Sequence, residues 1–584
     1  MNTVWLGRRD LIEDVNRSLS LPFLANSLES VPGSSSVSQP PWCSFQGVIC
    51  GNISGSPNYM SVMSIDIGWR NLLGTLPSSI GNFQCLTSFV MASNSINGTI
   101  PTSISALGKL QLCNLSSNYL IGTIPVAVSY LTLLATLDLS FNRLSGTIPS
   151  IISNLIYLEN LSLKHNSLKG TIPIFLGNSM VLGMLDISHN SMTGVIPSTI
   201  GSITALVNLD LSQNIFTDTI PSSIGNLQSL TSISFFNNYL SGSIPSQLYT
   251  LKKLKLLNFG SNFLSGTISS FISDLLSLTS IAFDTNIFKG SMPSTIGLLT
   301  ALTVLNIKDN RLVGNIPRSI GNLGSLTSID FSKNHLSDTI PDTIGTLSNL
   351  KTINLMSNSL TGTIPNAIVT MKELENIFLA SNSLTGFIPP DVGNLTAAVF
   401  ISLSGNSLSG TIPISLSLLN HLRYLDFRSN YLTMGAATTV STSIFPLSLL
   451  TDGYIFLEDN CIQFEYLNYI VKPTHCRPTL SPTRISSKIG LSSQNKSVSQ
   501  DIRIIKNNQI SSYLGFLAFL AILIAIFICF VHYERVNKVH CSLDSQFQSR
   551  NFLQLIYYSI LSIPFLGYLM SNGLWLLAHN VQNK

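Results

Sequence analysis

The chain has 584 residues, of which 31 are Lys or Arg and 27 are Asp or Glu. Charged residues make up only 10% of the sequence, against roughly 25% in an ordinary soluble domain, and the formal net charge is +4. These values exclude a basic nucleic-acid-binding groove and a long solvated tail of one charge, whereas 45% hydrophobic residues indicate a membrane protein or an unusually large core.

The amino-terminal region, residues 1–59, precedes the regular pattern of the chain. Its first residues, MNTVWLGRRDLIEDVN, contain no apolar stretch of the length found in a secretory signal peptide. Because the features described below indicate export, we expect the natural start to lie upstream of Met1.

From residue 60 to residue 435 the sequence repeats every 24 residues, and we count sixteen copies, the first with Arg70 in place of a recurring asparagine. In the copy that contains Asn142, Leu137 and Leu139 alternate with polar residues as in a β-strand. One unit cannot bury its own leucines, so the units must stack around a continuous core. We expect the asparagine to turn its amide inward, toward backbone groups of the tight turn, and assign it no binding role. It recurs at Asn94, Asn118, Asn142, Asn166, Asn190, Asn214, Asn238, Asn262, Asn286, Asn310, Asn334, Asn358, Asn382, Asn406 and Asn430.

The repeat LxxLxxLxLxxNxLxGxIP closely resembles the plant-type leucine-rich repeat of cell-surface receptor-like proteins, receptor kinases and polygalacturonase-inhibiting proteins. The few departures are Asp218 and Asp338 in the glycine position and Ser269 in the proline position. The resemblance implies a right-handed α/β solenoid with a parallel β-sheet on its concave face. It also implies an extracellular recognition domain, not an enzyme. The chain contains no GxSxG, HExxH, Walker lysine or CxxC pair, and we expect no cofactor or metal.

The resemblance extends to both ends of the solenoid. The segment WCSFQGVIC looks like the amino-terminal cap motif CxWxGVxC of the family, with Phe45 in the tryptophan position. With the cysteine pair that follows the last repeat, it implies the cap disulfides Cys43–Cys50 and Cys461–Cys476, and therefore an oxidising compartment. The length of the solenoid between the two pairs excludes one zinc site that joins them.

Two further cysteines lie within the repeats. Cys113 occupies a core position of a strand and Cys85 lies in an outer turn, and we expect both to be ordinary buried thiols. Cys529 falls inside an apolar run, where we expect it to be inert or lipidated.

The carboxyl-terminal region predicts a membrane anchor. The run YLGFLAFLAILIAIFICFV, from Tyr513 to Val531, has no charge and is long enough to cross a hydrocarbon core of about 30 Å. Arg and Lys residues beyond it favour a cytoplasmic location. A second apolar stretch is either a returning span or an interfacial or re-entrant segment. The expected organisation is cap 1–59, solenoid 60–435, cap 436–483, stalk 484–511, transmembrane helix 512–533, cytoplasmic loop 534–551, second membrane segment 552–578 and tail 579–584.

Asn-x-Ser/Thr sequons are distributed along the chain and fit a secreted surface. They lie at Asn16, Asn52, Asn97, Asn114, Asn160, Asn394 and Asn495, and we expect glycosylation at all but the first.

Two sets of residues depart from the Ser, Asn, Asp and Thr that fill most exposed strand positions. Phe141, His165 and His189 each directly precede the asparagine in successive copies, with Lys164 beside them. The two histidines should lie about 5 Å apart, close enough to share a metal or to repel each other when protonated. The alternative is that they are two solvated imidazoles on a polar face.

The second set lies at the other end of the solenoid. Phe378, Phe400 and Tyr424 should project from three consecutive strands, the last two in one column, with Arg428 nearby. Aromatic residues and arginine are the residue types enriched at binding hot spots. The alternative is that these side chains only pack under the carboxyl-terminal cap.

We therefore expect a plasma-membrane receptor-like protein with an extracellular ectodomain. Its concave face would bind a peptide, protein or glycan ligand. Because no kinase motif follows the first membrane segment, signalling would require a partner co-receptor kinase. The alternatives are a membrane-tethered inhibitor of an extracellular wall-degrading enzyme and a passive adhesion or coat protein.

Overall fold

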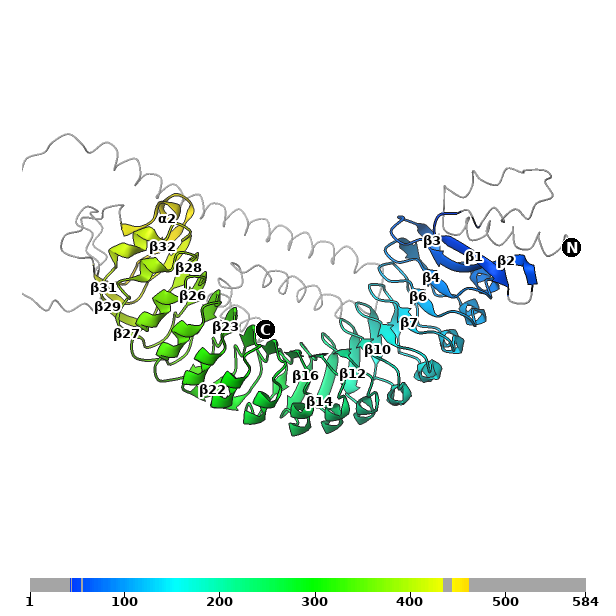
Figure 1. Cartoon of the computed structure of the whole chain (residues 1–584), viewed down its shortest axis with the longest axis horizontal. Coiled ribbons are helices and arrows are strands. Elements are labelled where there is room, and N and C mark those ends of the chain that lie inside the picture. Colours follow the sequence, from blue (N-terminus) through cyan, green and yellow to red (C-terminus); the bar gives the residue numbers. More distant parts are fainter. Residues whose placement is uncertain (1–42, 44, 54–55, 434–443, 462–584) are drawn as a thin grey trace, which may run out of the picture. The chain divides into compact units, whose positions relative to one another are not determined.

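The structure, a computed structural model, describes residues 43, 45–53, 56–433 and 444–461. These residues form one curved solenoid with an 18-stranded sheet along its inner side and short 3-10 helices along its outer side (Figure 1). The predicted leucine-rich-repeat solenoid with a long parallel sheet is confirmed. No helix within the described residues is long and apolar enough to cross a membrane, and the predicted stalk and membrane segments lie outside them.

The inner sheet begins with an antiparallel pair, β1 (Val48–Ile53) and β2 (Ser56–Asp66), and continues with parallel three-residue strands. Each repeat pairs with the next in a register of 24 residues, so that Leu137 lies beside Leu161. The parallel strands are β4 (Ser88–Val90), β6 (Leu112–Asn114), β7 (Thr136–Asp138), β9 (Asn160–Ser162), β11 (Met184–Asp186), β13 (Asn208–Asp210), β15 (Ser232–Ser234), β17 (Leu256–Asn258), β19 (Ser280–Ala282), β21 (Val304–Asn306), β23 (Ser328–Asp330), β25 (Thr352–Asn354), β26 (Asn376–Phe378), β28 (Phe400–Ser402), β30 (Tyr424–Asp426) and β32 (Tyr454–Phe456).

A second set of short parallel strands follows the turn of most repeats. It comprises β3 (Leu73–Thr75) with β5 (Ser95–Asn97); β8 (Ser145–Gly146), β10 (Ser167–Gly170), β12 (Ser191–Val195), β14 (Ile215–Thr219), β16 (Tyr239–Gly242) and β18 (Phe263–Leu264); β20 (Lys289–Gly290), β22 (Arg311–Gly314) and β24 (His335–Leu336); and β27 (Thr385–Phe387), β29 (Ser407–Thr411) and β31 (Tyr431–Thr433).

The outer side carries one 3-10 helix in each repeat, and an α-helix, α2 (Leu447–Asp452), after the last of them. Proline directly precedes most of these helices, because its fixed φ suits the residue that leads into a helical turn. The 3-10 helices are η3 (Ser78–Asn82), η4 (Thr102–Ala106), η5 (Val126–Tyr130), η6 (Ser150–Asn154), η7 (Ile174–Asn178), η8 (Ser198–Ser202), η9 (Ser222–Asn226), η10 (Ser246–Thr250), η11 (Ser270–Asp274), η12 (Ser294–Leu298), η13 (Arg318–Asn322), η14 (Asp342–Thr346), η15 (Asn366–Thr370), η16 (Val392–Asn394) and η17 (Ile414–Leu418).

The leucines of all repeats form a single buried core between these layers. The recurring asparagine closes the turns as predicted. Asn142 accepts a hydrogen bond at Oδ1 from the backbone nitrogen of Leu120 (2.9 Å), and its Nδ2 donates to the carbonyl oxygens of Leu115 (2.9 Å) and Leu139 (3.2 Å). One side chain thus satisfies backbone groups of two adjacent repeats that would otherwise be buried without partners.

The backbone conformation and a close contact explain why the return segment carries a glycine. Gly146 has a φ of +75°, and a Cβ on it would lie 2.7 Å from Cγ2 of Thr123 in the preceding repeat. Any larger residue is therefore strained there, both by its backbone and by this contact.

The two caps differ in how much of them is described. The predicted disulfide between Cys43 and Cys50 is present. Cys461 is also disulfide-bonded, and Cys476, its predicted partner, lies outside the described residues. Cys113 is a buried free thiol, as expected, and burial followed by the charge of Asp138 raises its pKa to about 12. Cys85 is also a free thiol but is only half-buried, so the expected full burial is wrong there.

After the last regular repeat the spacing of the asparagine increases to thirty residues, and the sheet nevertheless continues. Asn460 accepts from the backbone nitrogen of Leu432 (3.1 Å) and donates to the carbonyl oxygen of Phe427 (2.8 Å), as the asparagine of a regular repeat does. Strand β32 pairs with β30 in the same way, Tyr424 beside Tyr454. The cap that begins at residue 436 in the sequence interpretation therefore contributes a further strand to the concave sheet.

Candidate functional site

The outward positions of the inner strands form columns, because equivalent residues of successive repeats lie side by side. Phe400, the first residue of β28, registers with Tyr424 of β30, which registers with Tyr454 of β32. Phe378, the last residue of β26, registers with Ser402 and so lies in the neighbouring column. The predicted placement of Phe400 and Tyr424 in one column is confirmed.

Four rings from three strands form an aromatic cluster, which we define as Phe400, Tyr424, Tyr454 and Phe456. The centroids of Phe400 and Tyr424 are 5.9 Å apart, those of Tyr424 and Phe456 5.6 Å and those of Tyr454 and Phe456 6.5 Å. Phe400 is 38% exposed and Tyr454 is 51% exposed. The cluster is therefore a partly open apolar surface within the polar concave face, and offset or tilted rings at such distances attract one another.

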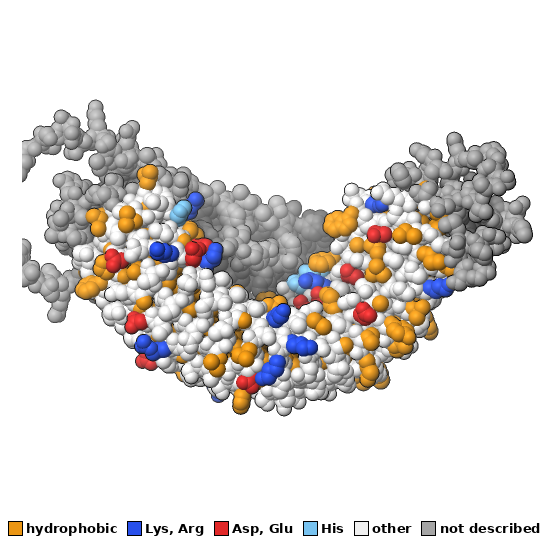
Figure 2. All heavy atoms as spheres, viewed as in Figure 1, with side chains coloured by type: hydrophobic (Ala, Val, Ile, Leu, Met, Phe, Trp, Pro, Cys, Tyr) orange, Lys and Arg blue, Asp and Glu red, His pale blue; other side chains and the backbone are white. Residues whose placement is uncertain are grey.

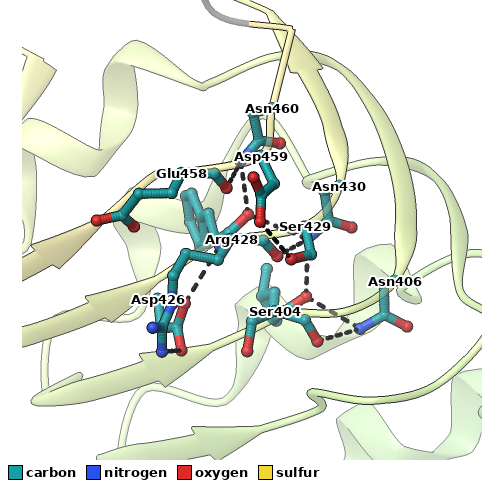
Figure 3. Close-up of polar contacts among 11 residues, drawn as sticks. Ser404, Asn406, Asp426, Arg428, Ser429, Asn430, Glu458, Asp459 and Asn460 are labelled. Carbon is teal, nitrogen blue, oxygen red and sulfur yellow. Dashed lines mark hydrogen bonds and ion pairs between the residues drawn. The ribbon is translucent and has the colours of Figure 1, made fainter. Parts of the chain in front are cut away.

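Arg428 contacts both a ring of the cluster and the carboxylate of Asp426. Its guanidinium lies 4.6 Å above the ring of Phe456 and makes two hydrogen bonds to Asp426, from Nε to Oδ1 (2.9 Å) and from Nη2 to Oδ2 (2.8 Å). The side chain of Asp426 is fully buried, whereas that of Arg428 is 35% exposed. Figure 3 shows Arg428 turned back onto Asp426, with Ser429 and Asp459 on the adjoining turns. The charge of Arg428 is thus compensated within the protein.

A buried hydroxyl without a hydrogen-bond partner among the described residues lies in the column of Phe378, between Phe378 and Asp426. Ser402 registers with Phe378 on one side and with Asp426 on the other, and it is almost fully buried. Its Oγ makes no hydrogen bond to any residue that the structure describes.

A shallow depression of about 680 Å³ borders the cluster at the entry to the strands. Val399 and Arg423, which directly precede Phe400 and Tyr424, contribute to its lining. Glu375 also lines it and forms an ion pair of 3.3 Å with Lys351. Figure 2 shows basic, acidic and histidine side chains together at this end of the solenoid. The full lining is Lys372, Glu373, Glu375, Thr396, Ala397, Val399, His421 and Arg423.

The second predicted set, Phe141, His165 and His189, forms a stack of rings. The ring centroids of Phe141 and His165 are 4.5 Å apart and those of His165 and His189 are 3.7 Å apart, with 23° between the planes of each pair. All three residues have a positive φ, between 51° and 53°, because they occupy the tight corner before the asparagine. We call these residues the histidine stack.

Both histidines of the stack favour the neutral form. Burial, followed by the charge of Lys164, lowers the pKa of His165. Burial, His165 and Lys164 together lower the pKa of His189 to about 4, against the opposing effect of Asp210. Among the described parts of the chain, no three His, Cys, Asp or Glu side chains gather as ligands for a metal.

The predicted glycosylation sites fall on different surfaces. Asn97 and Asn394 are exposed, whereas Asn114 and Asn160 are half-buried on strands of the inner sheet. Oδ1 of Asn114 accepts hydrogen bonds from the backbone and the hydroxyl of Ser116 (3.0 and 2.7 Å). Asn52 lies on β1, and Asn16 and Asn495 lie outside the described residues.

Sequence reasoning missed Tyr454 and Phe456 because the six-residue slip places them beyond the last regular repeat. A signal was present: they precede Asn460 by six and four residues, the same offsets by which Tyr424 and Asp426 precede Asn430. Aligning the cap on its asparagine would have added both rings to the site.

Comparison with known proteins identifies the repeats. Two family models match, both described as leucine-rich repeat. No curated protein matches the chain. The first model covers residues 324–384, and the second covers residues 133–155, 157–179, 182–203, 205–227 and 301–323.

Several solved structures share the fold. The chain is 32% identical to a TDR receptor, with a TM-score of 0.61, and the similarity covers 63% of this chain and 64% of that one, less than two thirds of the receptor. It is 30% identical to the plant peptide hormone receptor RGFR1 in complex with RGF2, with a TM-score of 0.56, over 72% of this chain and 80% of that one. It is 26% identical to the Arabidopsis receptor kinase HAESA in complex with the peptide hormone IDA and the co-receptor SERK1, with a TM-score of 0.53, over 78% and 86% of the two chains.

Ectodomains of this kind are binding scaffolds and not enzymes, which agrees with the absence of catalytic motifs from the sequence. The repeat, the cap disulfide, the continuous sheet and the identity to RGFR1 all lead to one assignment. The chain belongs to the plant-type leucine-rich-repeat receptor-like proteins.

Proposed function

We propose that the protein is a cell-surface receptor that binds an extracellular peptide at the aromatic cluster and signals through a partner kinase. The observation that carries this proposal is the cluster itself, four rings and an arginine from consecutive strands of a concave face that elsewhere carries polar residues and single aliphatic ones. Tyrosine, phenylalanine and arginine dominate binding hot spots because they contribute large contact areas with few rotatable bonds.

The rigidity of the site supports the same function. Each strand of the cluster is fixed by its ladder to the next repeat and by its buried asparagine, so that binding orders little of the receptor. A preformed site loses less conformational entropy when it binds, and more of the contact energy appears as affinity.

The chemistry of the cluster restricts the ligand. Because Asp426 already neutralises Arg428, the rings favour an apolar, aromatic or proline residue over a carboxylate. The neighbouring depression offers both signs of charge, through Glu375 and Arg423, for a polar group next in the ligand.

Location and signalling are parts of the same proposal. The predicted membrane segment at 512–533 would anchor the receptor in the plasma membrane, with the solenoid outside the cell. RGFR1 is bound to RGF2, and HAESA is bound to IDA and to the co-receptor SERK1, which supports a peptide ligand and a co-receptor kinase as partners here.

Site-directed photo-crosslinking tests where the ligand binds. The full chain is expressed on plant cells with benzoylphenylalanine in place of Tyr454, and with the same amino acid in place of Tyr239 as a matched control. Both tyrosines are 51% exposed, but Tyr239 lies on β16, away from the concave columns. We expect a peptide adduct by mass spectrometry at position 454 only. Equal adducts at both positions, or an adduct to a secreted wall-degrading enzyme, would contradict the proposal.

Substitution of Phe400 and Tyr424 by Ala measures the contribution of the rings. Removing two neighbouring hot-spot rings should weaken binding of the captured peptide at least about tenfold, as truncation of such residues does elsewhere. Unchanged affinity would show that the peptide binds elsewhere than at the cluster. In wild-type cells, proximity labelling from the carboxyl terminus should recover a membrane kinase after addition of the peptide, and a passive adhesion protein should recover none.

A further inference from the structure

Nine large apolar side chains are exposed together on the outer side of three successive repeats. Their exposed fractions run from 41% for Leu133 to 75% for Met180. Figure 2 shows hydrophobic side chains gathered over these repeats, which are cyan in Figure 1. We call them the apolar outer patch: Val126, Tyr130, Leu133, Ile156, Tyr157, Ile174, Phe175, Met180 and Val181.

The patch is continuous because its repeats are neighbours. Helix η5 packs beside η6, and η6 packs beside η7. Val126 and Tyr130 belong to η5, and Ile174 and Phe175 belong to η7. The remaining members follow these three helices in the turns that lead to the next inner strand.

The fold does not require these residues. In the repeat that follows, the positions of Ile174 and Met180 are filled by Ser198 and Thr204. In the repeat that precedes, the position of Leu133 is filled by Lys109. The core of the solenoid is complete in all of these repeats, so the apolar side chains serve a purpose outside it.

The surface is also free of charge and of sugar attachment sites. The segments 126–134, 150–158 and 174–182 contain no Asp, Glu, Lys, Arg or His and no Asn-x-Ser/Thr sequon. The patch therefore offers no ion pair to a charged partner protein and no cation to an anionic lipid surface. A partner of the same kind, apolar and uncharged, fits without repulsion.

The area of the patch is that of a protein interface. Nine side chains, each about half exposed and offering roughly 150–200 Å² in all, present about 800 Å² of apolar surface. This is more than the ~300–600 Å² of the largest patch on a typical monomer, and it equals the ~800 Å² that each partner buries in a standard interface.

From these observations we infer that the apolar outer patch is the contact surface of a symmetric homodimer. In a twofold contact the same patch meets itself, which an uncharged apolar surface allows and a charged one does not. Such a dimer is joined by its outer sides and leaves both concave faces open. It is therefore independent of the ligand site proposed above.

The test introduces a charge at the centre of the patch. Tyr157 occupies the same position as Leu133 and Val181 in the repeats on either side, so that it lies in the middle of the patch. The full chain is purified in detergent as wild type, Tyr157→Lys and Tyr157→Glu. Leu276→Lys is the matched control, because Leu276 is 62% exposed in the same turn of a distant repeat, where the adjacent repeats carry Lys252 and Thr300 in its position and the apolar surface does not continue.

We expect the wild type and L276K to be dimers by light scattering, and Y157K and Y157E to be monomers with at least a tenfold higher dissociation constant. Mixing Y157K with Y157E should restore dimers, since the opposite charges then face each other across the twofold axis. Thermal unfolding followed by circular dichroism should be alike in all four proteins, which separates loss of contact from loss of folding.

The opposite results are equally clear. A monomeric wild type would overturn the inference, whatever segment or partner then covers the patch. A dimer that both charged variants retain would place the contact elsewhere on the chain.

Discussion

The histidine stack and the aromatic cluster are built on the same sheet but use different positions of the repeat. In the stack, three rings come from one column, at the corner after the strand, and lie nearly face to face. In the cluster, the rings come from two columns of the strands themselves. Tyr424 is tilted by 37° against Phe400 and by 51° against Phe456, whereas Tyr454 and Phe456 are nearly parallel with centroids 6.5 Å apart. The cluster is therefore packed less closely than the stack, whose centroids lie 3.7 and 4.5 Å apart.

The two regions also treat charge differently. The stack has Lys164 beside it and keeps its histidines neutral, while the cluster contains an ion pair between the buried Asp426 and the partly exposed Arg428. The two hydrogen bonds of this pair fix the orientation of the guanidinium over Phe456, and with it the shape of the surface. The cluster thus holds one guanidinium in a fixed orientation, whereas the stack holds two neutral imidazoles beside a lysine.

The largest effect should follow from removing the buried acid. Asp426→Ala deletes two charge-assisted hydrogen bonds from the guanidinium of Arg428 and one from its backbone nitrogen, and it removes the carboxylate that faces this guanidinium. Because Arg428 can still reach water, we expect a local loss of about 2 kcal/mol, below the ~3–5 kcal/mol of a fully buried pair. Hydrogen exchange of the full chain should become correspondingly faster in β30 and β32.

Asp138→Ala is the matched control, in the same position of a repeat near the stack. Asp138 is half-buried and accepts a hydrogen bond from the backbone of Ser140 at 3.0 Å. Its loss should cost only about 0.5–1 kcal/mol, the ordinary value of one such bond. Equal losses at both sites would mean that the ion pair adds nothing to the cluster.

Much of this comparison could be predicted from the sequence. A period of 24 residues fixes which residues share a column, so the alignment of Phe400 with Tyr424 and of His165 with His189 follows from counting. The inward asparagines follow from the need to pair the backbone of a tight turn. These features depend only on spacing and on elementary hydrogen bonding.

Other features depend on side-chain rotamers and packing, which the repeat spacing does not determine. Counting places Asp426 at the end of a strand and Arg428 two residues later, but it does not reveal whether the arginine points outward or back toward the acid. The slip of six residues hides Tyr454 and Phe456, since α2 replaces the usual 3-10 helix. The sequence does not distinguish the exposed residues of the outer patch from core leucines, because apolar residues occupy both the buried and the exposed positions of these turns.

A smaller effect should distinguish the stack as a proton-sensitive region. The pKa of His189 in the folded state is about 4, below the 6.5 of an unperturbed histidine, so the unfolded chain binds more protons between these values. The contribution of the histidines to stability is complete above pH 6.5 and is lost as the pH falls through about 4. Urea unfolding should show this loss in the wild type and a shallower one in H165Q/H189Q.

The same change at a separate site serves as the control. His335→Gln alters an exposed histidine on β24, outside the stack, and shows how much the loss of a single imidazole elsewhere changes the measured curve. If H165Q/H189Q kept the full slope, the stack would have no special response to acid.

The smallest effect concerns the backbone corner on which the stack stands. Thr285 occupies the corresponding corner of another repeat with a φ of 54°, a conformation that is unfavourable for a β-branched residue by about 1–2 kcal/mol and that asparagine tolerates better. Thr285→Asn should therefore stabilise the protein by about 0.5–1 kcal/mol in urea unfolding, since it relieves part of this strain. Thr300→Asn, an exposed threonine with an ordinary φ, should have no effect.

The result bears on the difference between the two regions. If Thr285→Asn stabilises the chain, then Phe141, His165 and His189 also carry backbone strain that the strand positions of the aromatic cluster avoid. Stacking at 3.7 and 4.5 Å would then be one of the interactions that compensate for it. If the substitution is neutral, the corner is relaxed by its hydrogen bonds to the next repeat, such as that from the nitrogen of Thr285 to the carbonyl of Lys308, and the two regions differ only in their rings and charges.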